Sequence, residues 1–106
     1  MKKQTFVFKK DKYSLKRGNY SRLLELRCRV CNDIILIYQK DGKGALLRIY
    51  LDRIVSLKLP KRKMLICQKC KEVIGVLMKY KKENRNSYRL FQGSLKKRII
   101  SSKNVR

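Results

Sequence analysis

Four cysteines in two identical pairs constrain this chain more than any other feature. The pairs are Cys28-x-x-Cys31 and Cys67-x-x-Cys70, with 35 residues between them. Two cysteines separated by two residues place both sulfurs on one side of a tight turn, at a spacing that one metal ion bridges. Two such turns complete one tetrahedral site. Because the sequence has no histidine and no further cysteine, the pattern predicts one structural Zn²⁺ held by all four thiolates.

Three other uses of paired cysteines remain open. Two disulfides would need an oxidising compartment, and the first residues are too charged, with too short an apolar run, for an export signal. A redox-active CxxC would be a single reactive pair in a βαβ setting, not two symmetric copies. An iron–sulfur cluster with four cysteine ligands is the third alternative. A four-cysteine site leaves no open coordination position, so we do not expect catalysis at the metal.

The two pairs belong to an internal repeat with an offset of 39 residues. Residues 26–35 match residues 65–74: each has an aliphatic residue, the cysteine pair, an acidic residue and then a β-branched run. Each half is typical of a strand, a cysteine-bearing turn and a second strand. The sequence therefore predicts a mainly β domain whose hairpins each carry one two-cysteine turn, or knuckle.

The knuckle sequences resemble those of a known class of domain. Leu-Arg-Cys-Arg-Val-Cys and Leu-Ile-Cys-Gln-Lys-Cys-Lys-Glu-Val-Ile-Gly are similar to the paired knuckles of zinc-ribbon and rubredoxin-like domains, over roughly residues 24–80. The resemblance implies a small β-rich ribbon with one Zn²⁺, and such ribbons often occur in ribosomal and transcription proteins. The connector between the knuckles is longer than in many ribbons, so we expect it to make contacts of its own.

The chain has 106 residues, which is enough for one domain. We expect a basic N-terminal extension over 1–20, the zinc-ribbon-like domain over 21–93 and a basic C-terminal tail over 94–106, with both termini extended.

Within the domain, glycine-rich and polar segments predict turns at 41–44 and 82–87, and the second turn closes a hairpin. The connector is less clear: residues 45–53 fit either a short helix or a strand, and Val55–Leu59 favours a strand.

The charge balance is extreme. Thirty Lys and Arg stand against seven Asp and Glu, a formal net charge of +23. A compact chain with this charge repels itself, and a polyanionic partner relieves the repulsion. Basic side chains attract phosphates, and tyrosines interleaved with them can stack on unpaired bases. The residues predicted to contact nucleic acid are Lys9, Lys10, Lys12, Tyr13, Lys16, Arg17, Tyr20, Lys61, Arg62, Lys63, Lys96, Lys97 and Arg98.

Together these features predict an RNA-binding structural or accessory component of a ribonucleoprotein, with the ribosome and its rRNA as the leading candidate. The alternative is a DNA-binding zinc-ribbon accessory or regulator of transcription, which would need a basic helix for the major groove. We do not expect an enzyme or a small-molecule substrate, because histidine is absent and the acidic residues form no cluster in the sequence. No run approaches the roughly 20 apolar residues of a membrane span, and we expect a cytoplasmic location.

Overall fold

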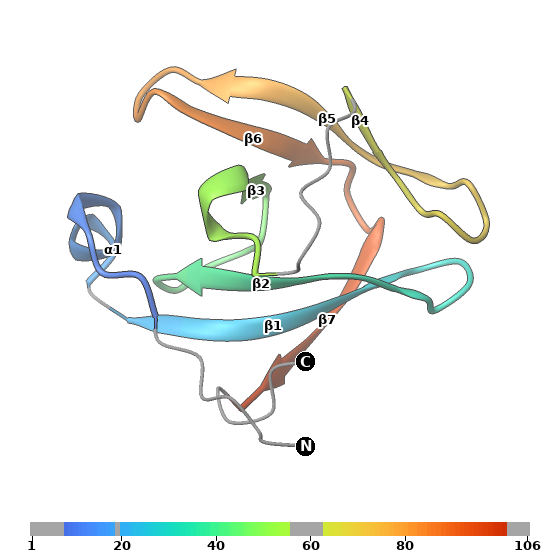
Figure 1. Cartoon of the computed structure of the whole chain (residues 1–106), viewed down its shortest axis with the longest axis horizontal. Coiled ribbons are helices and arrows are strands. Elements are labelled where there is room, and N and C mark those ends of the chain that lie inside the picture. Colours follow the sequence, from blue (N-terminus) through green and yellow to red (C-terminus); the bar gives the residue numbers. More distant parts are fainter. Residues whose placement is uncertain (1–7, 19, 56–62, 102–106) are drawn as a thin grey trace.

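The computed structural model describes residues 8–18, 20–55 and 63–101, and β-strands dominate it as the sequence predicts. Two antiparallel sheets lie one above the other, with one short helix at one end (Figure 1). The elements, in chain order, are α1 (Lys12–Lys16), β1 (Ser21–Cys28), β2 (Ile34–Asp41), β3 (Arg48–Tyr50), the 3-10 turn η1 (Leu51–Arg53), β4 (Met64–Ile66), β5 (Val73–Tyr80), β6 (Arg85–Leu90) and β7 (Leu95–Ile100). Neither helix in these described ranges has the length and apolar character to cross a bilayer.

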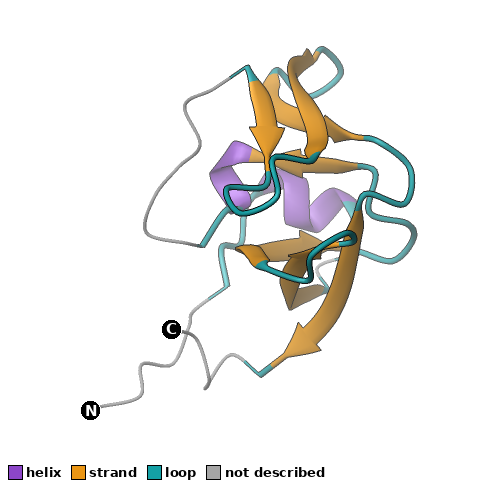
Figure 2. Cartoon of the chain, turned by 90° about the vertical axis from the view of Figure 1, so that its right-hand side faces the viewer, coloured by secondary structure: helices purple, strands orange, loops and turns teal. Residues whose placement is uncertain are grey.

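The two halves of the sequence repeat fall in different sheets. The hairpin β1–β2 belongs to the three-stranded sheet, in the order β2-β1-β7, and the hairpin β4–β5 belongs to the four-stranded sheet, in the order β3-β6-β5-β4. The predicted hairpin after β5 is confirmed, because β6 pairs along its length from Tyr80–Arg85 to Gly75–Leu90. Figure 2 shows the two sheets from the side, with the helical segments at the level between them.

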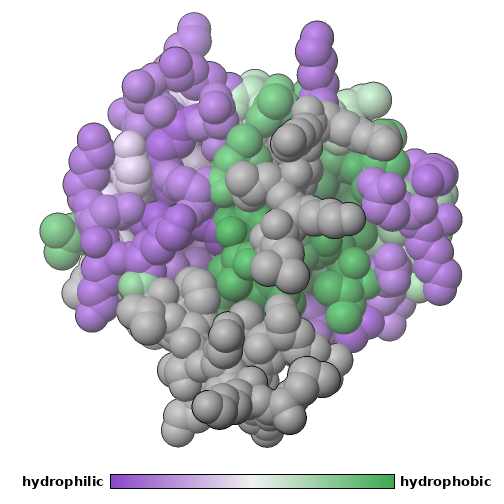
Figure 3. Space-filling view, viewed as in Figure 1, coloured by the Kyte–Doolittle hydropathy of each residue, from purple (hydrophilic) through white to green (hydrophobic). Residues whose placement is uncertain are grey.

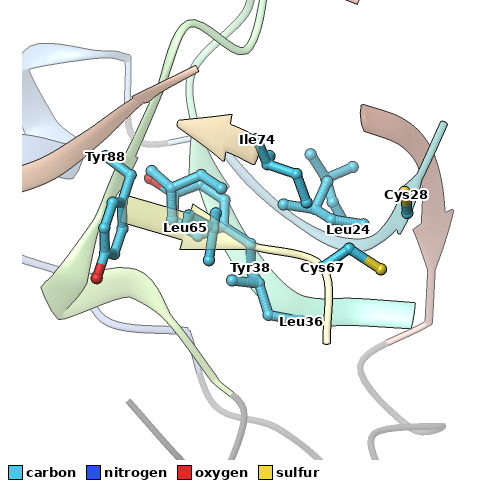
Figure 4. Close-up of a cluster of buried hydrophobic side chains, with 10 residues drawn as sticks. Leu24, Cys28, Leu36, Tyr38, Leu65, Cys67, Ile74 and Tyr88 are labelled. Carbon is cyan, nitrogen blue, oxygen red and sulfur yellow. The ribbon is translucent and has the colours of Figure 1, made fainter. Parts of the chain in front are cut away.

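The core lies between the sheets. Alternate residues of a strand point to opposite faces, and one face of β1 and β2 carries the cross-strand pairs Leu24–Tyr38 and Leu26–Leu36. These side chains meet apolar residues of the four-stranded sheet in one buried cluster (Figure 4). Its buried members are Leu24, Leu26, Cys28, Leu36, Tyr38, Ile49, Leu65, Cys67, Ile74 and Tyr88.

The three-stranded sheet extends into the predicted C-terminal tail. Residues 95–100 form β7, which pairs antiparallel with β1 from Cys28–Leu95 to Leu23–Ile100. Three consecutive basic residues made a strand unexpected here from the sequence. β7 is an edge strand, so Lys96, Lys97 and Arg98 remain exposed. Leu95 packs against the core, so the sheet does not end at the predicted boundary of residue 93.

The connector resolves into a short strand, β3, followed by the single turn η1, so both conformations considered for residues 45–53 are present in part. Beyond them, the Val55 N–H donates to the Ile37 carbonyl, 2.9 Å away. The remainder of the strand predicted for residues 55–59 lies outside the described residues.

A network of buried arginines joins the N-terminal residues and the connector to the sheets. Arg53, only 2% exposed, donates to Asp41 at 2.8 Å and to Asp11 at 2.6 Å. The hydrogen bond from Arg53 lowers the pKa of Asp11 to about 2, against the opposing effect of its partial burial. The Asp11 carboxylate also caps α1 by accepting from two backbone N–H groups. A five-residue helix is unstable alone, so these contacts hold it in place.

The second buried arginine of this network is Arg85. It donates to Asp52 at 2.7 Å and to Glu83 at 3.0 Å, and its guanidinium lies 3.7 Å from the centre of the Tyr50 ring. Glu83 also accepts from Arg17 at 2.9 Å. Four of the seven acidic residues thus meet around three arginines, a cluster that the scattered acids of the sequence do not reveal.

We expect Arg53→Met to lower the free energy of unfolding by about 3 kcal/mol, because it leaves the buried Asp41 carboxylate without its ionic partner. Urea denaturation of the metal-saturated protein measures this loss. Arg29→Met is the matched control, since Arg29 is exposed and should change stability by no more than about 0.5 kcal/mol. Equal losses for the two variants would show that the Arg53 ion pairs do not stabilise the fold.

Candidate metal centre

The two knuckles have the same backbone geometry. In the first, the Cys28 N–H donates to the Asp33 carbonyl at 2.8 Å, and the Asn32 N–H donates to the Cys28 carbonyl at 2.9 Å. In the second knuckle, the Cys67 N–H donates to the Glu72 carbonyl and the Lys71 N–H donates to the Cys67 carbonyl, each at 2.9 Å. The predicted repeat of strand, cysteine turn and strand is therefore a repeat of structure.

The equivalence extends to backbone details on both sides of each turn. The residue after the second cysteine has a positive φ in both knuckles, 64° at Asn32 and 66° at Lys71. The pairing in each hairpin shifts register at the matching place, and the extra residue, Ile35 or Ile74, belongs to the strand after the turn. Such an irregularity twists a strand locally and re-aims its side chains, and here each extra residue follows the second cysteine of its knuckle by four positions.

The fold brings all four sulfurs together. The Sγ atoms lie within 4.8 Å of one another, and the contacts Cys28–Cys70 and Cys31–Cys67, each 3.5 Å, join the two knuckles. A tetrahedron with metal–sulfur bonds near 2.3 Å has sulfur–sulfur edges of about 3.8 Å. The thiols form no disulfide, so the donor set and its spacing fit one tetrahedral metal ion.

Backbone N–H groups point at the sulfurs and affect their ionisation. Burial disfavours the Cys67 thiolate, but the N–H groups of Cys70 and Lys69 donate to its sulfur and lower the thiol pKa to about 7. At Cys70 the Glu72 N–H favours the thiolate, whereas burial and the three neighbouring sulfurs raise the pKa to about 12. Four thiols this close cannot all ionise without a cation among them, which is the behaviour expected of a metal site.

The residues predicted to contact nucleic acid are spread over separate segments. Seven of them are exposed lysines near α1, before β4 or on β7: Lys9, Lys10, Lys12, Lys16, Lys63, Lys96 and Lys97. Arg98, also on β7, is exposed as well. Of these, Lys9 donates from Nζ to the Asp52 carbonyl at 2.8 Å, and Arg98 lies 3.7 Å from Glu25. Lys61 and Arg62 lie outside the described residues.

Tyr13 and Arg17 have partners inside the fold. The Tyr13 hydroxyl donates to the Glu83 carbonyl at 3.2 Å, and the Arg85 guanidinium lies 4.0 Å from the centre of its ring. Arg17 is ion-paired with Glu83. These contacts favour a structural role for both residues, although nucleic-acid contact at either one stays a prediction. Tyr20 is 46% exposed, and the Arg22 guanidinium lies 5.5 Å from the centre of its ring.

Comparison of the chain with protein-family models, curated proteins and solved structures finds no significant match in any of the three. The case for a metal centre therefore depends on the cysteines and the geometry of their two knuckles.

We expect the purified protein to contain one metal ion per chain by elemental analysis, and Cys28→Ser and Cys67→Ser each to remove it. Either change takes one of four ligands from the site, and the energy of metal binding is part of the folding energy. Lys69→Ala is the matched control within a knuckle, because Lys69 is exposed and the change keeps its backbone N–H, which donates to the Cys67 sulfur. Full metal content in either serine variant would contradict a single shared centre.

Proposed function

We propose that this protein is a zinc-ribbon-like, RNA-binding structural or accessory component of a ribonucleoprotein, with a ribosomal particle as the leading candidate. The metal in this proposal is one structural Zn²⁺. The four sulfurs lie within 4.8 Å of one another, which supports a single metal ion. In an iron–sulfur cluster, which contains two or more irons, the cysteine sulfurs would lie further apart. With four thiolate ligands the ion has no position for a substrate, so its role is to join the knuckles.

The observation that carries the proposal is the distribution of ion pairs. All seven ion pairs among the described residues use an arginine, and none uses a lysine. Five of the seven acidic residues form ion pairs with these arginines. All of the described lysines except Lys40 are exposed. The surface therefore presents lysine charge that the chain itself does not neutralise, which favours a polyanionic partner.

The fold favours RNA over duplex DNA as that partner. The described residues contain one α-helix, and its five residues are too few to serve as a recognition helix in the major groove. Hydrophilic residues gather on the side of the molecule where α1 and the β5–β6 turn lie, as the left of Figure 3 shows. Basic segments beside an exposed tyrosine suit irregular RNA, whose unpaired bases are free to stack.

We expect a structured rRNA fragment to bind better than duplex DNA of equal length at about 0.15 M salt, where bulk charge attraction is screened. Competition binding with a labelled RNA measures the preference, and a salt titration should give a log–log slope of roughly −0.7 to −0.9 per phosphate neutralised. Tyr20→Leu should reduce the preference because it removes a stacking surface.

The control is Tyr13→Phe, which keeps a ring already covered by Arg85 and should leave the RNA preference unchanged. If duplex DNA competes equally, the DNA-directed transcription accessory becomes the better hypothesis.

A further inference from the structure

A hollow of about 280 Å³ lies between the end of β2, the turn that follows it and β3. Its lining includes Lys40 and Asp41 at the end of β2, Lys43 in the turn, and Arg48 and Tyr50 of β3. The first knuckle precedes β2 and the hollow lies at the opposite end of this eight-residue strand, so about 20 Å of β structure separates the two features. The hollow is thus distinct from the metal centre.

Six cationic side chains and one carboxylate, that of Asp41, line the hollow. Three of the six, Arg17, Arg53 and Arg85, are ion-paired with carboxylates of the buried network. Lys40, Lys43 and Arg48 form no ion pair within the described part of the chain. Three positive charges therefore line one partly enclosed space, where the single carboxylate, that of Asp41, is already ion-paired with Arg53. The Arg48 guanidinium lies 4.4 Å from the centre of the Tyr80 ring, a contact that leaves its charge in place.

Lys40 is the least expected of the three. Its side chain is buried, with the residue only 7% exposed, and Nζ donates to the Gly42 carbonyl at 3.0 Å. It lies directly opposite Arg22 in the pairing of β1 with β2, and like charges in that position destabilise a sheet. The Arg22 Nε atom is itself buried without a hydrogen-bond partner among the described atoms. Burial and the positive charges of Arg22, Lys97 and Arg17 lower the pKa of Lys40.

We propose that this hollow is a binding site for a phosphate group, held by Lys40, Lys43 and Arg48. A phosphate dianion would neutralise the charges that the fold leaves together, and it would accept the N–H donors that Lys40 has free. Ammonium and guanidinium groups are the usual donors to phosphate. The volume is near the lower limit of small-molecule pockets, which suits one or two phosphate groups rather than a bulky ligand.

Two sources supply this chemistry: the backbone of a bound RNA, or a free phosphate compound. The site does not depend on the RNA proposal, because the free compound needs no RNA. The test therefore has one arm for each source.

Inorganic pyrophosphate is the probe for the first arm, titrated into the metal-loaded full chain at about 0.15 M salt, where non-specific attraction is screened. Binding should saturate in calorimetry and shift the amide resonances of Gly42, Lys43 and Ala45. Lys40→Met should weaken binding about tenfold or more, as expected for loss of one charge-assisted hydrogen bond. It should also remove the rise in Tm that pyrophosphate gives the wild type.

Lys96→Met is the matched control, because it removes the same charge from an exposed position on β7 and should weaken pyrophosphate binding less than about twofold. Equal losses in the two variants, or amide shifts that do not saturate, would overturn the proposal.

In the second arm, a short RNA competes with pyrophosphate. Displacement, together with weaker RNA binding by Lys40→Met than by Lys96→Met, assigns the site to a backbone phosphate. Pyrophosphate binding that RNA does not disturb assigns it to a free phosphate compound. Failure of the RNA proposal thus leaves the first arm intact, and failure of the first arm does not depend on RNA.

Discussion

The meeting of four cysteine sulfurs joins the two sheets, because each sheet contributes one cysteine-bearing hairpin. Cys28 and Cys31 come from the hairpin of one sheet, and Cys67 and Cys70 from the hairpin of the other. Two of them, Cys28 and Cys67, are also fully buried members of the core between the sheets. A metal ion held by these sulfurs would therefore couple metal binding to core packing, and we expect folding to depend on it.

Electrostatic repulsion is the opposing constraint, because a net charge of +23 acts against any compact state. The fold uses its few carboxylates where repulsion would be strongest, around the buried Arg53 and Arg85. Arginine suits these positions because its planar guanidinium donates to two carboxylates at once. The lysines in the described part of the chain stay at the surface, with the buried Lys40 as the exception.

The molecule therefore has different chemistry at its two ends. The cysteine turns lie together on the right of Figure 1, and α1 with the far end of β2 lies on the left. The first end holds the four cysteine sulfurs that could bind a metal ion. The second end is cationic and carries the hollow beside the arginine network. The strands β1 and β2 separate the two ends, so a partner at the cationic end need not disturb the metal ligands.

The sequence by itself determined the knuckles, the mainly β fold and the hairpins, because each depends on residues close together: a two-residue spacing between cysteines, an alternating pattern and a polar turn. Tertiary structure decided the rest. The pairing of Leu95 with Cys28 and the ion pair of Asp11 with Arg53 join residues far apart in the chain, where no local pattern marks the partner. In the sequence, Tyr13 lies among lysines and is a candidate for stacking on a base, yet the fold packs its ring against Arg85. The packing of the two sheets determines which distant residues become neighbours, because a buried charge is costly unless an opposite charge lies beside it.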